Sequence, residues 1–281
     1  MTVTPLSPAI GAVVDGVDLA ASGAAHGVAL RAALVKHHVL FFRGQAHVKV
    51  TQLRDFAALF GALHRHPLYP NAPEAPEIIV LDTDESNPPD NDNWHTDVTF
   101  IQTPPLGAVL QAIRIPETGG GDTCWASTAA AYDALSPPLR KFLVGLTATH
   151  DIQKSFPATR WASGDEEAKY RAAVAKHPPI VHPVVREHPE TGRLGLFVNS
   201  GFTTHINELS RTESDALLAL LFAHVSKPEF TVRWRWSAGD VAFWDNRLTQ
   251  HYALNDYLPH RRTMHRATIL GDRPRGPTLR S

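Results

Sequence analysis

The sequence predicts a mainly β protein with flanking helices, in which short strands form an antiparallel barrel or jelly roll. Many short apolar runs are separated by turns rich in Gly, Pro and Asp, which is typical of such folds. No Gly/Ser run, charge block or low-complexity tract marks a linker within the 281 residues. We therefore expect one domain over residues 1–281 with a sizeable core.

Local patterns place the elements from the N-terminus onward. Helices are predicted at residues 27–38, 50–60, 136–145 and 211–225, and strands at 39–42, 77–81, 106–113, 231–236, 241–244 and 262–269. In the second helix, Leu53, Phe56 and Phe60 recur three and four positions apart and predict one buried face. The fourth helix follows a capping box that runs from Ser210 to Glu213.

Composition excludes several classes of protein. The formal net charge is −1, so nothing indicates a nucleic-acid or membrane partner. Cys124 is the only cysteine, so no intramolecular disulfide can form, which fits a reducing compartment. The N-terminus lacks the features of a signal peptide, and no apolar run is long enough to cross a membrane. We expect a soluble cytoplasmic protein.

Two histidines and one aspartate form a candidate metal set. His95 and Asp97 are one residue apart, and on a strand they would share one face. His251 lies far downstream, and the fold must bring it to the same ion. The His-x-Asp spacing alone is weak evidence in a chain with 16 histidines. Two imidazoles and one carboxylate are nevertheless the ligand set of non-haem Fe(II) oxygenases.

Two arginines on one strand indicate anion binding. Arg262 and Arg266 would lie on the same face of the strand predicted at 262–269. A guanidinium that points into the protein is costly unless it meets an anion. Iron oxygenases with the ligand set described above need an anionic co-substrate, 2-oxoglutarate. This anion would pair with one arginine and leave the other for a second anion.

Long stretches of the chain resemble the TauD/TfdA family of 2-oxoglutarate dioxygenases, and within it the taurine dioxygenases. The resemblance runs from about residue 5 to about residue 274. It is carried by the stretches 66–70, 87–97, 201–204 and 244–266. It implies a single TauD/TfdA-type domain with a double-stranded β-helix (jelly roll) core, the metal at its open end, and a homo-oligomer.

The resemblance also implies roles for individual residues. Fe(II) would bind to His95, Asp97 and His251, while 2-oxoglutarate would bind to Thr123 and Arg262. The residues that match the substrate pocket are His66, Tyr69, Asn91, Val98, Phe100, Phe156, Phe202 and Arg266. With O2, the enzyme would hydroxylate taurine at the carbon bearing sulfur, giving sulfite and aminoacetaldehyde with succinate and CO2.

Two local features disagree with this pattern. Strict strand alternation places Val98 and Phe100 on the face opposite His95 and Asp97, so the chain must leave the strand after Asp97 if all four are to reach one pocket. Three glycines precede Asp122 where the family pattern has two, so the turn that delivers Thr123 could differ.

Three alternatives stay open from the sequence. The nearest is a dioxygenase of the same family acting on another sulfonate, an alkyl sulfate or an aryloxyacetate. A zinc hydrolase could use the same three ligands, and its activity would need neither oxygen nor 2-oxoglutarate. A non-catalytic anion-binding barrel would bind ligand without turnover.

Overall fold

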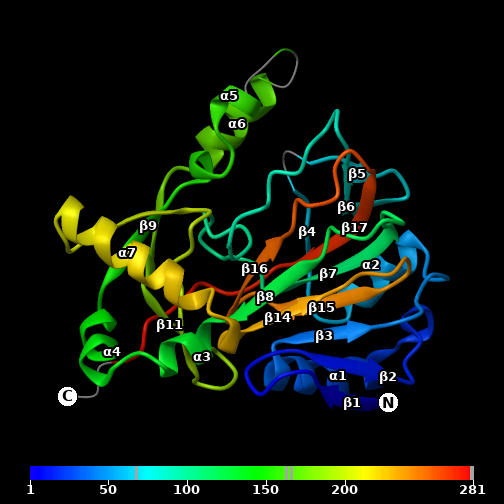
Figure 1. Ribbon diagram of the computed structural model, residues 1–281, viewed down its shortest axis with the longest axis horizontal. Helices are drawn as coiled ribbons and strands as arrows, with labels where there is room; N and C mark the ends of the chain where they lie inside the picture. The colour runs from blue at the N-terminus through cyan, green and yellow to red at the C-terminus, as the bar shows by residue number, and fades with distance from the viewer. Residues whose placement is uncertain (67–68, 162–163, 165–166, 279–281) are drawn as a thin grey trace.

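A nine-stranded sheet is the largest part of the fold within residues 1–66, 69–161, 164 and 167–278, which the computed structural model describes (Figure 1). Its strand order is β1-β2-β3-β15-β7-β17-β6-β5, and β4 pairs with β17. These strands are β1 (Thr2–Pro5), β2 (Ala12–Asp15), β3 (Val39–Phe42), β4 (Leu63–His64), β5 (Asn71–Ala72), β6 (Ala75–Thr83), β7 (Gly107–Arg114), β15 (Val241–Asp245) and β17 (Arg262–Ile269). The strand predicted at 262–269 is confirmed to the residue.

Helices α1 (Ala24–His37) and α2 (Val50–Ala58) cover one face of this sheet. Leu30, Phe56 and Phe243 are among the buried residues of the core between them. The helix predicted at 27–38 begins three residues earlier, and the one predicted at 50–60 ends two residues sooner. A short 3₁₀ helix at Leu19–Ala21 precedes α1.

A three-stranded sheet packs on the other face, in the order β14 (Thr231–Trp234), β8 (Thr123–Ser127) and β16 (Thr249–Ala253). Large aromatic side chains fill the space between the two sheets. Phe41 stacks on Trp234 with ring centroids 4.2 Å apart, and Trp125 meets Phe41 edge-on. Two facing sheets around an aromatic core, antiparallel except for the parallel pair β2–β3, confirm the predicted jelly roll with flanking helices.

The remaining elements extend the molecule beyond the barrel. They are α3 (Thr128–Asp133), α4 (Pro137–Leu143), β9 (Thr147–His150), α5 (Ala158–Trp161), α6 (Glu167–Lys176), β10 (Ile180–Pro183), β11 (Val185–Glu187), β12 (Leu194–Leu196), β13 (Thr203–Ile206), α7 (Arg211–Val225) and 3₁₀ turns at Ile152–Lys154 and Pro228–Phe230. Ser210 and Glu213 form the predicted capping box at the start of α7. Figure 1 shows α5 and α6 above the barrel, with α7 and α4 at its side.

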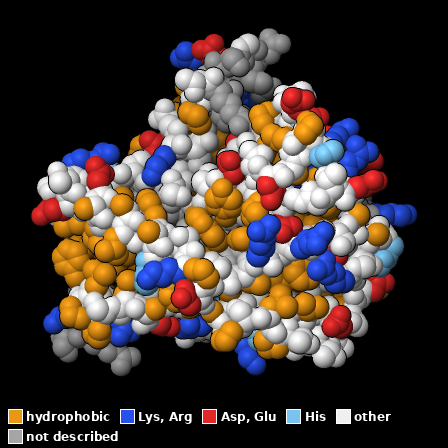
Figure 2. All heavy atoms as spheres, viewed as in Figure 1, with side chains coloured by type: hydrophobic (Ala, Val, Ile, Leu, Met, Phe, Trp, Pro, Cys, Tyr) orange, Lys and Arg blue, Asp and Glu red, His pale blue; other side chains and the backbone are white. Residues whose placement is uncertain are grey.

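Apolar side chains gather on the surface near α7 and α4 (Figure 2). Phe142 on α4 and Leu220 on α7 each leave 50% of their area exposed. None of the helices in the described part of the chain has the length and apolar character needed to cross a membrane.

Candidate active site

Backbone pairing brings the two candidate histidine ligands together. The His95 N–H donates to the His251 carbonyl (3.0 Å), and the His251 N–H donates back to the His95 carbonyl (2.8 Å). This isolated bridge joins the segment before position 97 to β16, and it places the two imidazole centroids 4.2 Å apart. The pair therefore depends on the barrel closing, not on local sequence.

Asp97 lies in a turn, so the prediction that His95 and Asp97 share a strand is wrong beyond the first residue. Only His95 is bridged, and Asp97 begins a turn in which Val98 has a φ of +53°. That left-handed residue reverses the chain direction that a strand would keep. As a result Val98 and Phe100 line the same cavity as His95 and Asp97, which strand alternation forbids.

The three candidate ligands converge on one point. Within the described residues, His95, Asp97 and His251 form the one group whose donor atoms could share an ion, all within 4.8 Å of one another. Asp97 Oδ1 lies 3.7 Å from His95 Nε2 and 3.5 Å from His251 Nε2. His95 Nδ1 donates to the Asn93 carbonyl (2.8 Å), which leaves the Nε2 lone pair directed at Asp97. The arrangement is that of a two-histidine, one-carboxylate metal site.

Burial and charge set the protonation states that metal binding needs. Burial lowers the pKa of His95 and lowers that of His251 far below its usual value, so both rings are neutral. Burial alone would raise the pKa of Asp97, but the charge and hydrogen bond of Arg266 outweigh it and hold the pKa at about 2. Two neutral nitrogens and one carboxylate suit a divalent cation.

Asn246 fixes the backbone of Asp97 and was missed from the sequence. Its side-chain oxygen accepts the Asp97 N–H (2.9 Å), and its amide donates to the carbonyls of Asp97 (3.1 Å) and Pro105 (3.2 Å). Asn246 lies in the turn between β15 and β16, so this side chain ties the aspartate to the strand that carries His251. No pattern in the sequence distinguishes it from other turn asparagines.

Arg266 holds the second oxygen of Asp97. Its terminal nitrogen lies 2.6 Å from Asp97 Oδ2, while Oδ1 faces the histidines. The guanidinium lies over the Trp244 ring, 5.5 Å from the centroid, and its buried Nε has no hydrogen-bond partner among the residues described. Arg266 is therefore able to hold the metal ligand and still donate to a second anion.

Arg262 occupies a different environment on the same strand. Its Nε and one terminal nitrogen are buried and have no hydrogen-bond partner within the part of the chain that the structure describes, and burial lowers its pKa to about 10. Gly119, Gly120 and Gly121 all have positive φ, and a Cβ on Gly121 would lie 2.7 Å from Arg262 Cδ. The three-glycine turn thus lets the backbone pass closely over the guanidinium.

Thr123 follows that turn at the start of β8. Its hydroxyl oxygen accepts the Trp236 indole N–H (3.0 Å), so the hydroxyl proton can be donated elsewhere. Asp122 accepts a hydrogen bond from Arg233 (2.7 Å), which anchors the turn from the outside.

A cavity of about 50 Å³ adjoins the metal triad. All eight residues expected to bind substrate line it: His66, Tyr69, Asn91, Val98, Phe100, Phe156, Phe202 and Arg266. The sequence analysis missed Ile79, Leu81, Asp90, Asn93 and Ser155. His66 Nδ1 accepts the Tyr69 N–H (3.3 Å), and burial lowers the His66 pKa to about 3, so the ring is neutral with its proton on Nε2.

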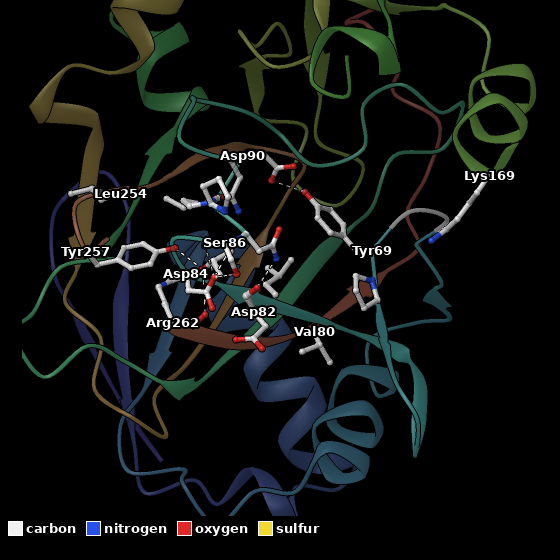
Figure 3. A pocket seen from close by; sticks show the side chains of 18 residues that line it. Tyr69, Val80, Asp82, Asp84, Ser86, Asp90, Lys169, Leu254, Tyr257 and Arg262 are labelled. Carbon is white, nitrogen blue, oxygen red and sulfur yellow. Dashed lines mark hydrogen bonds between the residues drawn. The ribbon is translucent and has the colours of Figure 1, made fainter. Parts of the chain in front are cut away.

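A second cavity of about 690 Å³ shares walls with the first (Figure 3). Tyr69, Leu81, Asp90 and Asn91 line both. Figure 3 shows Arg262 and Tyr257 on one side of the larger cavity, with Tyr69 and Lys169 on the other. The unpartnered guanidinium of Arg262 therefore borders a space large enough for a small organic anion.

Known proteins resemble this chain over nearly its whole length. The family described as "Taurine catabolism dioxygenase TauD, TfdA family" matches residues 2–268. The chain is 39% identical to the alpha-ketoglutarate-dependent sulfate ester dioxygenase of Pseudomonas putida, across 98% of this chain and 91% of that protein. Further relatives are named for sulfonates and for an aryloxyacetate.

Two solved structures share the fold. A taurine dioxygenase from Burkholderia xenovorans has a TM-score of 0.84 and 38% identity, over 99% of this chain and 92% of that one. AAD-2, solved in complex with Mn(II) and N-oxalylglycine, has a TM-score of 0.82 and 26% identity, over 98% and 99% of the two chains. This chain thus belongs to the TauD/TfdA family and is a 2-oxoglutarate-dependent dioxygenase.

Proposed function

We propose that Fe(II) binds to His95, Asp97 and His251 and that 2-oxoglutarate binds to Arg262 and Thr123. The observation that carries this proposal is a candidate metal triad beside one cavity and, bordering the adjoining cavity, the buried Arg262 guanidinium, two nitrogens of which have no hydrogen-bond partner among the described residues. An Arg–carboxylate pair and a threonine hydroxyl would hold the distal carboxylate of the co-substrate. The AAD-2 complex supports the pairing, because N-oxalylglycine is 2-oxoglutarate with one CH2 replaced by NH.

Taurine is the substrate that we propose for the small cavity. Arg266, through its Nε, and His66, through its Nε2 proton, would bind the sulfonate. A sulfonate is anionic at every physiological pH, which suits a permanently charged guanidinium and a neutral donor. Phe100, Phe156 and Phe202 enclose the short carbon chain and exclude water.

The chain's residues position the carbon that bears sulfur, and the cofactors carry the oxidation. When bound, the metal and 2-oxoglutarate activate O2, and 2-oxoglutarate leaves as succinate and CO2. Hydroxylation of the substrate carbon gives a hydroxysulfonate, which loses sulfite and leaves aminoacetaldehyde. Arg266 would link the metal site to the substrate, because it contacts the metal ligand Asp97 and would hold the leaving sulfite group.

A sulfate ester is the second candidate substrate. The Pseudomonas relative is named for sulfate esters, and the 690 Å³ cavity would accept a longer alkyl chain. Hydroxylation of the carbon bonded to the ester oxygen would release an aldehyde and inorganic sulfate instead of sulfite.

The first experiment measures sulfite from taurine with Fe(II), 2-oxoglutarate and air, beside a reaction without 2-oxoglutarate. We expect sulfite only in the complete mixture. Parallel reactions with alkyl sulfates, assayed for sulfate and aldehyde, test the second candidate. Consumption of 2-oxoglutarate without either product would reject both substrates and keep the cofactor assignment.

A pair of histidine variants tests the metal site. His95→Ala should abolish product formation and bound metal, while His47→Ala, which changes an exposed histidine paired with Asp18, should match the wild type. Full activity in His95→Ala would refute the ligand assignment. The cytoplasmic location and the homo-oligomer implied by the resemblance stay predictions.

A further inference from the structure

The turn Asn199–Phe202 connects β12 to β13 and carries one aromatic wall of the small cavity. Asn199 is fully buried. Its side-chain oxygen accepts the Phe202 N–H (2.9 Å), and its backbone N–H donates to Thr203 Oγ1 (2.9 Å). Asn199 therefore determines the path of the chain that delivers Phe202.

The same side chain reaches the opposite wall. Asn199 Nδ2 donates to Thr99 Oγ1 (3.2 Å), and Thr99 lies between Val98 and Phe100 in the turn after the metal ligand. Thr99 Oγ1 is also 2.9 Å from Nδ1 of the buried His150. Burial keeps His150 neutral by lowering its pKa far below the usual value, so the ring can accept the Thr99 proton. Every polar atom along this path has a partner.

The turn is also anchored to the segment that carries the metal ligand. Ser200 Oγ donates to the Trp94 carbonyl (2.7 Å). Gly201 lies against His95, and a Cβ on that glycine would be 2.9 Å from the His95 Cβ. These contacts fix the position of the turn, and so of Phe202, relative to the metal ligand His95.

We propose that Asn199 is a positioning residue that sets the spacing of Phe100 and Phe202 relative to the metal triad, and so determines which substrates fit. The two rings are 5.2 Å apart, and both line the cavity that also holds Arg266. This inference rests on the proposed function in one respect, since it takes that cavity as the substrate site. Asn199 hydrogen-bonds to both turns that carry these rings, and His150 adds a link from Thr99 to Thr203, the residue after Phe202.

The kinetic test compares Asn199→Ala and Thr99→Val with Thr99→Ser and Asn207→Ala. Thr99→Ser keeps the hydroxyl, and Asn207 is an exposed asparagine bonded to Thr147 and Thr149. The first two variants should raise the KM for the sulfonate about 10-fold and leave the KM for 2-oxoglutarate within about twofold. They should also consume more 2-oxoglutarate per product formed. Thr99→Ser and Asn207→Ala should resemble the wild type.

A purely structural role predicts a different result. Loss of stability alone would reduce the active fraction, and hence the apparent kcat, with both KM values unchanged. That outcome would overturn the proposal. If Asn199→Ala does not fold, the comparison of Thr99→Val with Thr99→Ser still decides it.

A crystal structure of Asn199→Ala, or of Thr99→Val, gives a readout that needs no substrate. We expect the Phe100–Phe202 centroid distance to depart from 5.2 Å while the spacing of the metal ligands is kept. Unmoved rings would overturn the proposal. If the wild type oxidises neither sulfonates nor sulfate esters, the proposed function fails, but this structural comparison still tests Asn199.

Discussion

Arg262 and Arg266 are four residues apart on β17, about 13 Å along the strand, yet they lie in opposite electrostatic environments. Arg266 already has an anion, because Asp97 Oδ2 is 2.6 Å away. Arg262 has two buried nitrogens without a hydrogen-bond partner among the described residues. The comparison teaches that one guanidinium is paired with a candidate metal ligand, whereas the other is buried at a cost that a bound anion would offset.

The largest expected effect comes from Arg262→Met. The KM for 2-oxoglutarate should rise about 100-fold or more, because two charge-assisted hydrogen bonds are lost. The same variant should raise the free energy of unfolding of the ligand-free protein by about 1–4 kcal/mol, since it removes an uncompensated buried charge. Kinetics and urea unfolding check both.

Arg261→Met is the matched control for that variant. Arg261 is exposed and paired with Asp82, so neither quantity should change. An unchanged KM for 2-oxoglutarate in Arg262→Met would remove the basis for the co-substrate site.

Arg266→Met should have the next largest effect, and in a different pattern. The KM for the sulfonate should rise about 100-fold, well above the change for 2-oxoglutarate. Metal affinity and unfolding free energy should both fall, because Asp97 loses its partner while it stays buried. Equal effects on the two KM values would mean that the binding roles of Arg262 and Arg266 have been wrongly assigned.

Asn246→Ala should weaken metal binding about 10- to 100-fold. The variant leaves all three ligands in place and frees the backbone of Asp97. Metal titration followed by activity measures the effect, with Asn207→Ala as the control. Wild-type metal affinity in Asn246→Ala would show that the turn holds Asp97 without this side chain.

The smallest expected effect is a change with pH in the metal-free protein. The folded-state pKa of Asp97 is depressed from 3.8 to about 2, so its ionisation contributes about 2 kcal/mol above pH 3.8, which is lost as the pH falls towards 2. In Arg266→Met, burial should raise this pKa instead. The stability gap between wild type and variant should therefore narrow on acidification, as urea unfolding at several pH values would measure. If the difference in unfolding free energy between wild type and variant did not change with pH, the ion pair between Arg266 and Asp97 would be contradicted.

Much of the fold was predictable from local patterns. The strand that carries both arginines was placed to the residue, and its burial alternates over positions 262–266 before the rest of the strand becomes fully buried. The left-handed conformation of Val98 could not be predicted from local patterns. A β-branched residue rarely adopts a positive φ, and only the surrounding contacts impose this conformation. Short strands such as β4 and β5 have too few residues to show any period.

The residues of the candidate site were also predictable only in part. Residues that would touch metal, co-substrate or substrate were found through the resemblance. Most of them line two adjoining cavities, and His251 joins them through its contact with Asp97, whereas Thr123 lines neither cavity. The residues that hold them were missed, Asn199 and Asn246 above all. Each acts through hydrogen bonds to segments distant in sequence, and such contacts leave no local pattern.

His95 and His251 are joined by a reciprocal backbone bridge, so the metal site can form only late in the synthesis and folding of the chain. A nascent polypeptide cannot assemble the site before position 251 has been synthesised and β16 has joined the barrel. Because only the folded chain presents the site, a bound metal ion would add to the free energy of unfolding of the protein. Iron starvation would appear as degradation of the enzyme as well as loss of its activity.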